Sequence, residues 1–177
     1  MGLNNFNTEA ASAFLAQARQ DASAARKTKR VEGEWVFTEG ETQFKASVAF
    51  QAGECVLESD FAPFMGGHGL APDPIQYCLY GLAACYAATF VSIATTEGLK
   101  LHSLKVAVEN VVNLSRSLGL SSAPVVEGVD VTLSVAADAS RERLEAIAQL
   151  ARDRCPGVYC LVHPIRLTTH LEIQGST

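Results

Sequence analysis

Apolar and polar residues alternate in three short runs of the N-terminal half, over residues 31–37, 44–50 and 55–57. Alternation with a period of two is typical of β-strands that bury one face. The short segments 39–41 and 51–53, each containing a glycine, separate these runs. We therefore predict three antiparallel strands joined by hairpins.

The longest stretch without charge runs from Pro74 to Thr96. Asp73 suits the N-cap, Pro74 the first helical position and Gly98 the C-terminal stop. The sequence thus predicts a helix of about six turns. Its flanks lack the clustered Lys and Arg residues that border membrane spans. We therefore expect a core helix rather than a membrane segment.

A helix that is apolar on all sides is buried on all sides, and a partner subunit could supply the missing wall. This predicts a homodimer.

The rest of the chain continues to mix helical and strand patterns. The predicted elements are a helix over residues 8–26, strands around 104–108 and 129–135, a helix beginning after Asp138 or Ser140, and a closing strand over 165–173. Strands and helices do not alternate regularly, so the fold class is α+β. We divide the chain into an N-terminal helical extension, 1–27, and one domain, 28–177.

Composition narrows the possible functions. Among 177 residues, 48% are hydrophobic and the net charge is -5, so no basic stripe is available to bind nucleic acid. The N-terminus does not resemble a signal peptide. Five cysteines, an odd number, do not suit a disulfide framework. We expect a cytoplasmic protein whose cysteines are buried, catalytic or metal-binding.

Two cysteines have surroundings that suggest chemistry. Cys85 lies in the predicted central helix, seven residues after Cys78. The two share a face but lie about 10 Å apart along the axis, too far for a disulfide. Cys155 follows a predicted helix and stands beside Arg152 and Arg154. Positive neighbours favour the thiolate, the form that attacks peroxides and disulfides.

The other cysteines are interpreted as inert core residues, because free cysteine is among the most buried residue types. These are Cys55, Cys78 and Cys160. Cys160 could join His163 and His170 at a metal, but the spacings Cys-x2-His and Cys-x9-His alone are weak signals for such a site. We predict no metal and no other cofactor.

Two motifs resemble the OsmC/Ohr family, the osmotically inducible and organic hydroperoxide resistance proteins. The first runs from Asp73-Pro74 to Cys85-Tyr86 and is similar to the family's cysteine-bearing helix. The second is Cys155-Pro156, between a short helix and the predicted closing strand. The order of elements agrees from about residue 28 to 174.

The resemblance implies an intertwined homodimer with active sites at the subunit interface, and a cysteine peroxidase without metal or haem. Cys85 would attack an organic hydroperoxide and become a sulfenic acid. Cys155 would condense with it to a disulfide, which an external dithiol would reduce.

The sequence departs from the family at the residues that accompany the reactive cysteine. Ile75 or Gln76 stands where the family has a Glu, and its Arg is missing near the first strand turn. We nominate Gln76, His68 and Arg30 for the substrate pocket, with Lys45 as a second nearby cation. Two alternatives stay open: a binding protein for a small apolar or thiol-containing ligand, and a dimer whose cysteines are all core.

Overall fold

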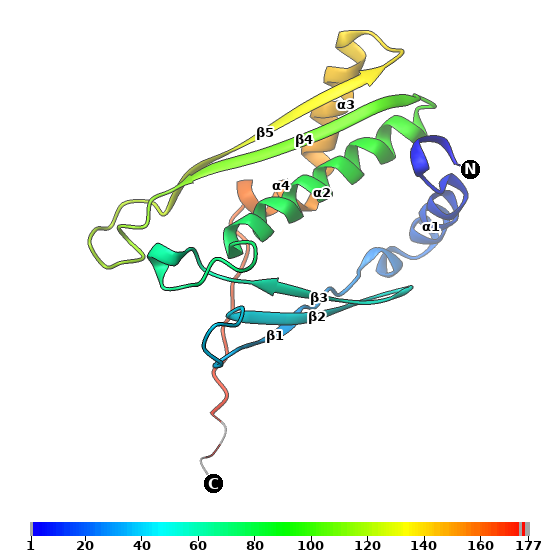
Figure 1. Ribbon diagram of the computed structural model, residues 1–177. Coiled ribbons are helices and arrows are strands. Elements are labelled where there is room, and N and C mark those ends of the chain that lie inside the picture. Colours follow the sequence, from blue (N-terminus) through cyan, green and yellow to red (C-terminus); the bar gives the residue numbers. More distant parts are fainter. Residues whose placement is uncertain (1, 174, 176–177) are drawn as a thin grey trace.

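The computed structural model describes residues 2–173 and 175. Its helices are α1 (Thr8–Gln20), α2 (Pro74–Thr96), α3 (Arg141–Arg154) and α4 (Pro156–Val162), and its strands are β1 (Glu32–Trp35), β2 (Phe44–Phe50), β3 (Gly53–Ser59), β4 (Leu101–Val112) and β5 (Val126–Ala137). Antiparallel sheets and one long central helix confirm the predicted α+β class (Figure 1).

The three predicted N-terminal strands form one antiparallel sheet in the order β1-β2-β3. Trp35 pairs with Phe44, so two aromatic side chains lie side by side at one end of the sheet. Other elements make few contacts with these strands. In Figure 1 the sheet lies below α2 as a separate layer.

Helix α2 has the predicted bounds and forms the centre of the core. The Asp73 side chain accepts a hydrogen bond from the Ile75 amide, and the Gln76 side chain accepts one from the Asp73 amide. Together these contacts cap the helix start. Its later turns bury Leu82 and Phe90, among others, and pack against β4 and α3. Although long and apolar enough to cross a membrane, α2 thus occupies the position of a core helix.

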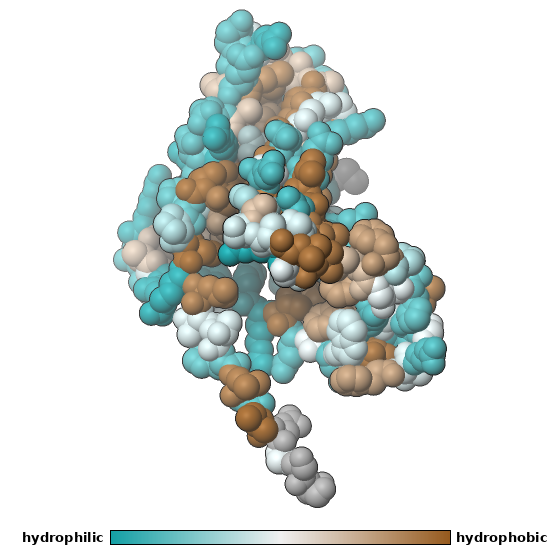
Figure 2. Space-filling view, turned by 90° about the vertical axis from the view of Figure 1, so that its left-hand side faces the viewer, coloured by the Kyte–Doolittle hydropathy of each residue, from teal (hydrophilic) through white to brown (hydrophobic). Residues whose placement is uncertain are grey.

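The first turns of α2 are not buried within the single chain, and we expected a partner subunit to cover part of this helix. Tyr80 is 71% exposed, and Cys78 is exposed as well. Apolar residues of the lower sheet, such as Trp35, are also exposed. Figure 2 shows hydrophobic residues on the surface and a hollow in the lower half of the molecule. One chain therefore leaves substantial apolar surface uncovered.

The C-terminal region differs from its prediction. Helix α3 is confirmed, with Ser140 as its N-cap. A second helix, α4, begins directly afterwards with Pro156 at its first position, so the Pro-Gly pair both ends one helix and starts another. The predicted strand over 165–173 is wrong: these residues form no strand and are exposed. Their alternation needs a neighbouring strand, and the described part of this chain does not supply one.

The N-terminal segment is tied to the far end of α2. The helix predicted over 8–26 ends at Gln20, and Asp21 caps a short 3-10 turn. The Asn4 side chain donates to the Thr95 hydroxyl at 2.9 Å and to the Leu99 carbonyl at 2.8 Å, and it accepts from the Leu101 amide at 2.8 Å. One side chain thus joins the N-terminus to the turn between α2 and β4.

Candidate functional site

The fold brings Cys85 and Cys155 together, although they are 70 positions apart in the sequence. Cys85 lies in the middle of α2, and Cys155 lies at the junction of α3 and α4. Their side chains are neighbours, because the Cys155 thiol raises the pKa of the Cys85 thiol. Contacts of α2 with both α3 and α4 hold this junction against the central helix. The fold therefore brings the two cysteine side chains into one site.

Gly157 completes the site from the first turn of α4. Its backbone amide donates a hydrogen bond to the Cys85 thiol. A Cβ added at Gly157 would lie 3.1 Å from Leu82 Cδ1, 3.5 Å from Cys85 Cβ and 3.7 Å from Cys155 Sγ. The absence of a side chain thus lets the two helices approach closely enough for the amide to reach the sulfur.

The environment raises the pKa of the Cys85 thiol above its usual value. Burial is the main cause, because it disfavours the charged thiolate. The Gly157 amide opposes this by stabilising the anion, while the neighbouring thiols of Cys155 and Cys160 raise the pKa further. No Arg or Lys among the described residues contributes to the shift. The site therefore keeps Cys85 predominantly as a thiol at neutral pH.

Access to the two sulfurs differs. Cys155 is 1% exposed, whereas Cys85 is partly exposed. Arg152 and Arg154, whose charges suggested a reactive Cys155, both lie exposed on α3. A small solute can thus reach Cys85 more readily than Cys155.

A cavity of about 620 Å³ lies beside this junction. Its walls come from α2, β5, the end of α3 and α4, and include Tyr86, Val131, Arg152, Val158 and Leu161. The Tyr86 hydroxyl donates to the Ala148 carbonyl at 2.8 Å. Burial raises the pKa of Tyr86, and Arg152 counteracts part of that effect. Tyr86 therefore fixes α2 to α3 immediately next to Cys85.

The other nominated pocket residues lie elsewhere. Gln76 is exposed and caps the start of α2. His68 is exposed in the glycine-rich loop, where its backbone amide donates to Asp60 at 3.1 Å. Arg30 forms an exposed ion pair with Glu32 at 2.7 Å. The structure of this chain thus does not bring these three side chains together with Cys85 and Cys155.

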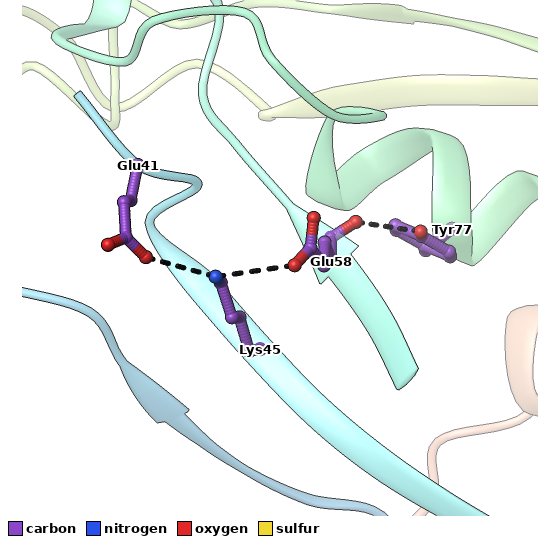
Figure 3. A network of polar contacts seen from close by, with 4 residues as sticks. All are labelled: Glu41, Lys45, Glu58 and Tyr77. Carbon is purple, nitrogen blue, oxygen red and sulfur yellow. Dashed lines mark hydrogen bonds and ion pairs between the residues drawn. The ribbon is translucent and has the colours of Figure 1, made fainter. Parts of the chain in front are cut away.

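Lys45, the second nominated cation, is engaged by two carboxylates. Its ammonium group lies 3.1 Å from Glu41 and 3.3 Å from Glu58. The Glu58 carbonyl accepts a hydrogen bond from the Tyr77 hydroxyl at 2.7 Å, so the network reaches the first turns of α2 (Figure 3). The two acids raise the pKa of Lys45. This network connects the lower sheet to α2 and does not reach the paired thiols.

The prediction of core positions for the remaining cysteines is wrong. Cys55, Cys78 and Cys160 are all exposed. Cys78 lies on the uncovered turns of α2, and Cys160 lies in the helix that the sequence pattern did not indicate. Within residues 2–173 and 175, no three potential ligands cluster to hold a metal ion.

Gly157 was not identified from the sequence as a site residue. Its position directly after Cys155-Pro156 could have indicated this role. A proline at the first helical position makes the amide of the next residue the first free donor of the helix. The sequence pattern predicts a strand, and no second helix, after Cys155-Pro156, so this donor was not recognised.

Comparison with known proteins agrees with this architecture. Residues 67–170, more than half of the chain, match the model of a family described as OsmC-like protein. None of the curated proteins matches the chain significantly.

Several solved structures share the fold. An OsmC-like protein from Mycoplasma pneumoniae is 18% identical with a TM-score of 0.53, covering 76% of this chain and 89% of its own. An organic hydroperoxide resistance protein OsmC from Legionella pneumophila is 16% identical with a TM-score of 0.57, covering 77% and 92%. An organic hydroperoxide resistance protein from Elizabethkingia anophelis is 15% identical with a TM-score of 0.53, covering 77% and 91%. At these identities the likeness establishes the fold.

Proposed function

The chain belongs to the OsmC-like protein family, and we propose that it is a thiol peroxidase that reduces organic hydroperoxides through Cys85 and Cys155. The observation that carries the proposal is the proximity of the two cysteines at the junction of α2, α3 and α4, where a Cβ added at Gly157 would lie 3.5 Å from Cys85 Cβ and 3.7 Å from Cys155 Sγ. A sulfenic acid formed beside a second thiol closes to a disulfide before it is oxidised further.

The chemistry assigns a separate task to each group. The Cys85 thiolate attacks the distal oxygen of the hydroperoxide, the O–O bond breaks, and the alkoxide leaves as an alcohol after taking a proton. The Cys155 thiolate then attacks the Cys85 sulfur, a disulfide forms, and the hydroxyl group leaves as water. An external dithiol restores both thiols. The Gly157 amide stabilises the charge on Cys85 when it ionises.

The active molecule in this proposal is a homodimer in the cytoplasm. Support comes from the apolar surface that the single chain leaves exposed on α2 and the lower sheet, including Trp35 and Tyr80. A second copy would cover this surface and enclose the hydroperoxide. All five cysteines are free, as expected in a reducing compartment.

A single-turnover measurement tests the activity. Reduced protein is mixed with cumene hydroperoxide, and the remaining hydroperoxide and free thiols are counted. Wild type should lose both thiols of the pair, Cys85→Ser should consume no hydroperoxide, and Cys155→Ser should stop at the sulfenic acid. Cys55→Ser, which changes an exposed cysteine on β3, is the matched control and should behave as wild type. Equal consumption by wild type and Cys85→Ser would refute the proposal.

A second candidate is a binding protein for a small apolar ligand. It is favoured by a cavity of about 550 Å³ between the lower sheet and the start of α2. Aromatic side chains dominate its lining, among them Trp35, Phe44, Tyr77 and Tyr80. Because Trp35 is the sole tryptophan, its fluorescence reports on this cavity. Saturable quenching by an apolar alcohol, without hydroperoxide consumption, would support this function over the first.

A further inference from the structure

Cys160 is a third thiol close to the paired cysteines. It lies in α4, three residues after Gly157, and residues three apart in a helix share a face. A Cβ added at Gly157 would lie 3.5 Å from Cys85 Cβ, so Cys85 lies against that face. Cys160 also contributes to the electrostatic environment of the Cys85 thiol. These observations place three sulfurs around the first turns of α4.

The three thiols differ in their access to solvent. Cys155 is 1% exposed, Cys85 is partly exposed and Cys160 is exposed. A disulfide between Cys85 and Cys155 would therefore lie against the core, where a bulky reductant reaches it poorly. Thiol–disulfide exchange depends on which sulfur can be approached. An exposed neighbouring thiol can exchange with the buried disulfide and form a new disulfide that the reductant can reach.

We propose that Cys160 is an exchange thiol that transfers the Cys85–Cys155 disulfide to the protein surface. This inference rests on the proposed function for the origin of that disulfide. The Cys160 thiolate attacks the Cys85 sulfur, the Cys85–Cys155 bond breaks, and the Cys155 thiolate leaves and takes a proton. The product is a Cys85–Cys160 disulfide, with no net change in electrons. An external dithiol then reduces this exposed bond by two electrons.

Helix geometry selects Cys85 as the sulfur that is attacked. Cys155 and Cys160 are five residues apart across α4. At 1.5 Å of rise per residue they lie about 8 Å apart along the axis, beyond the reach of a disulfide. A direct Cys155–Cys160 bond would need α4 to unwind. Cys85 instead faces α4 from the neighbouring helix, and Gly157 leaves the space between them free of a side chain.

The test begins from protein oxidised with diamide, so that it does not depend on hydroperoxide turnover. Chymotrypsin cleaves after Tyr159 and separates Cys155 from Cys160, and cleavage after Tyr80 separates Cys78 from Cys85. Mass spectrometry of the alkylated digest should then find Cys85 linked to Cys155 in one fraction and to Cys160 in another. Finding no Cys85–Cys160 peptide would overturn the proposal.

The second readout is the rate at which reduced lipoic acid restores the oxidised protein. Cys160→Ser should be reduced about tenfold more slowly than wild type, and Cys160→Ala should behave in the same way. Cys78→Ser, which changes an exposed cysteine away from α4, should match wild type. Equal rates for wild type and Cys160→Ser would overturn the exchange role and leave the proposed peroxidase function intact. If the protein consumes no hydroperoxide but Cys160 still exchanges with the disulfide, the proposed peroxidase function fails and the exchange role of Cys160 stands.

Discussion

The backbone amide of Gly157 donates a hydrogen bond to the thiol of Cys85. Pro156 has no amide hydrogen, so Gly157 carries the first free donor of α4. The position of a short, late helix thereby influences the ionisation of a cysteine in the central helix. The contact also depends on a residue without a side chain, which makes it open to a direct test.

Replacing Gly157 by alanine should slow alkylation of Cys85 by iodoacetamide about two- to fivefold at pH 8. The added methyl group would lie 3.1 Å from Leu82 Cδ1 and 3.5 Å from Cys85 Cβ, so either Leu82 or α4 must give by a few tenths of an ångström, and a shift of α4 weakens its hydrogen bond to the sulfur. Gly81→Ala is the control, because a methyl group there meets open space. An unchanged rate in Gly157→Ala would show that the amide does not stabilise the thiolate.

The alkylation rate of Cys85 should keep rising at pH values where the rate of an ordinary thiol no longer increases. Burial raises the pKa of Cys85, so the thiolate fraction is small at neutral pH and is still increasing above the ordinary value of about 8.5. Alkylation rates measured by peptide mass spectrometry from pH 6 to 10 should level off at higher pH than those of N-acetylcysteine. A plateau at or below the N-acetylcysteine midpoint would contradict this environment.

Tyr86→Phe should lower the free energy of unfolding by about 1 kcal/mol, the typical contribution of one buried hydrogen bond. The substitution removes the hydroxyl that donates to the Ala148 carbonyl at 2.8 Å and leaves the ring in place. Urea denaturation followed by circular dichroism measures the change. The exposed Tyr80 is a matched control, and Tyr80→Phe should be neutral. If both variants lose the same free energy of unfolding, the loss does not come from the hydrogen bond between Tyr86 and Ala148.

Asn4→Ala should release the N-terminal segment without unfolding the core. The variant loses three hydrogen bonds, to Thr95, Leu99 and Leu101. Hydrogen exchange should accelerate in residues 3–20, while α2 keeps its protection. Asn5→Ala is the control, because both asparagines have φ of 56° and alanine is equally strained there. Faster exchange in both variants would point to backbone strain instead of the lost contacts.

Local patterns were sufficient to predict most elements of the fold. Alternation located β1, β2 and β3, and Asp73-Pro74 located the start of α2, because these signals depend on residues that are close in sequence. The segment 165–173 has the same alternation but forms no strand. A strand needs a partner, and the pattern alone does not say whether one is within reach.

The candidate site was only partly predictable. Cys85 and Cys155 stood out because each belongs to a recognisable motif. Gly157 and Cys160 did not, since their relevance depends on how α4 packs against α2. The prediction of a core position for Cys160 is wrong because α4 was not among the expected elements. Burial depends on how the helices pack, and the preference of one residue type does not show that packing.

The sparse contacts between the three-stranded sheet and the rest of the chain have a thermodynamic consequence. A sheet of this size needs a packed apolar face to be stable, and β1, β2 and β3 find little of that face within one chain. In the proposed homodimer, folding of this layer is coupled to assembly, and mass action then makes the melting temperature depend on protein concentration. Differential scanning calorimetry over a hundredfold dilution series should show the midpoint falling with dilution, with the sheet losing its structure before the core around α2.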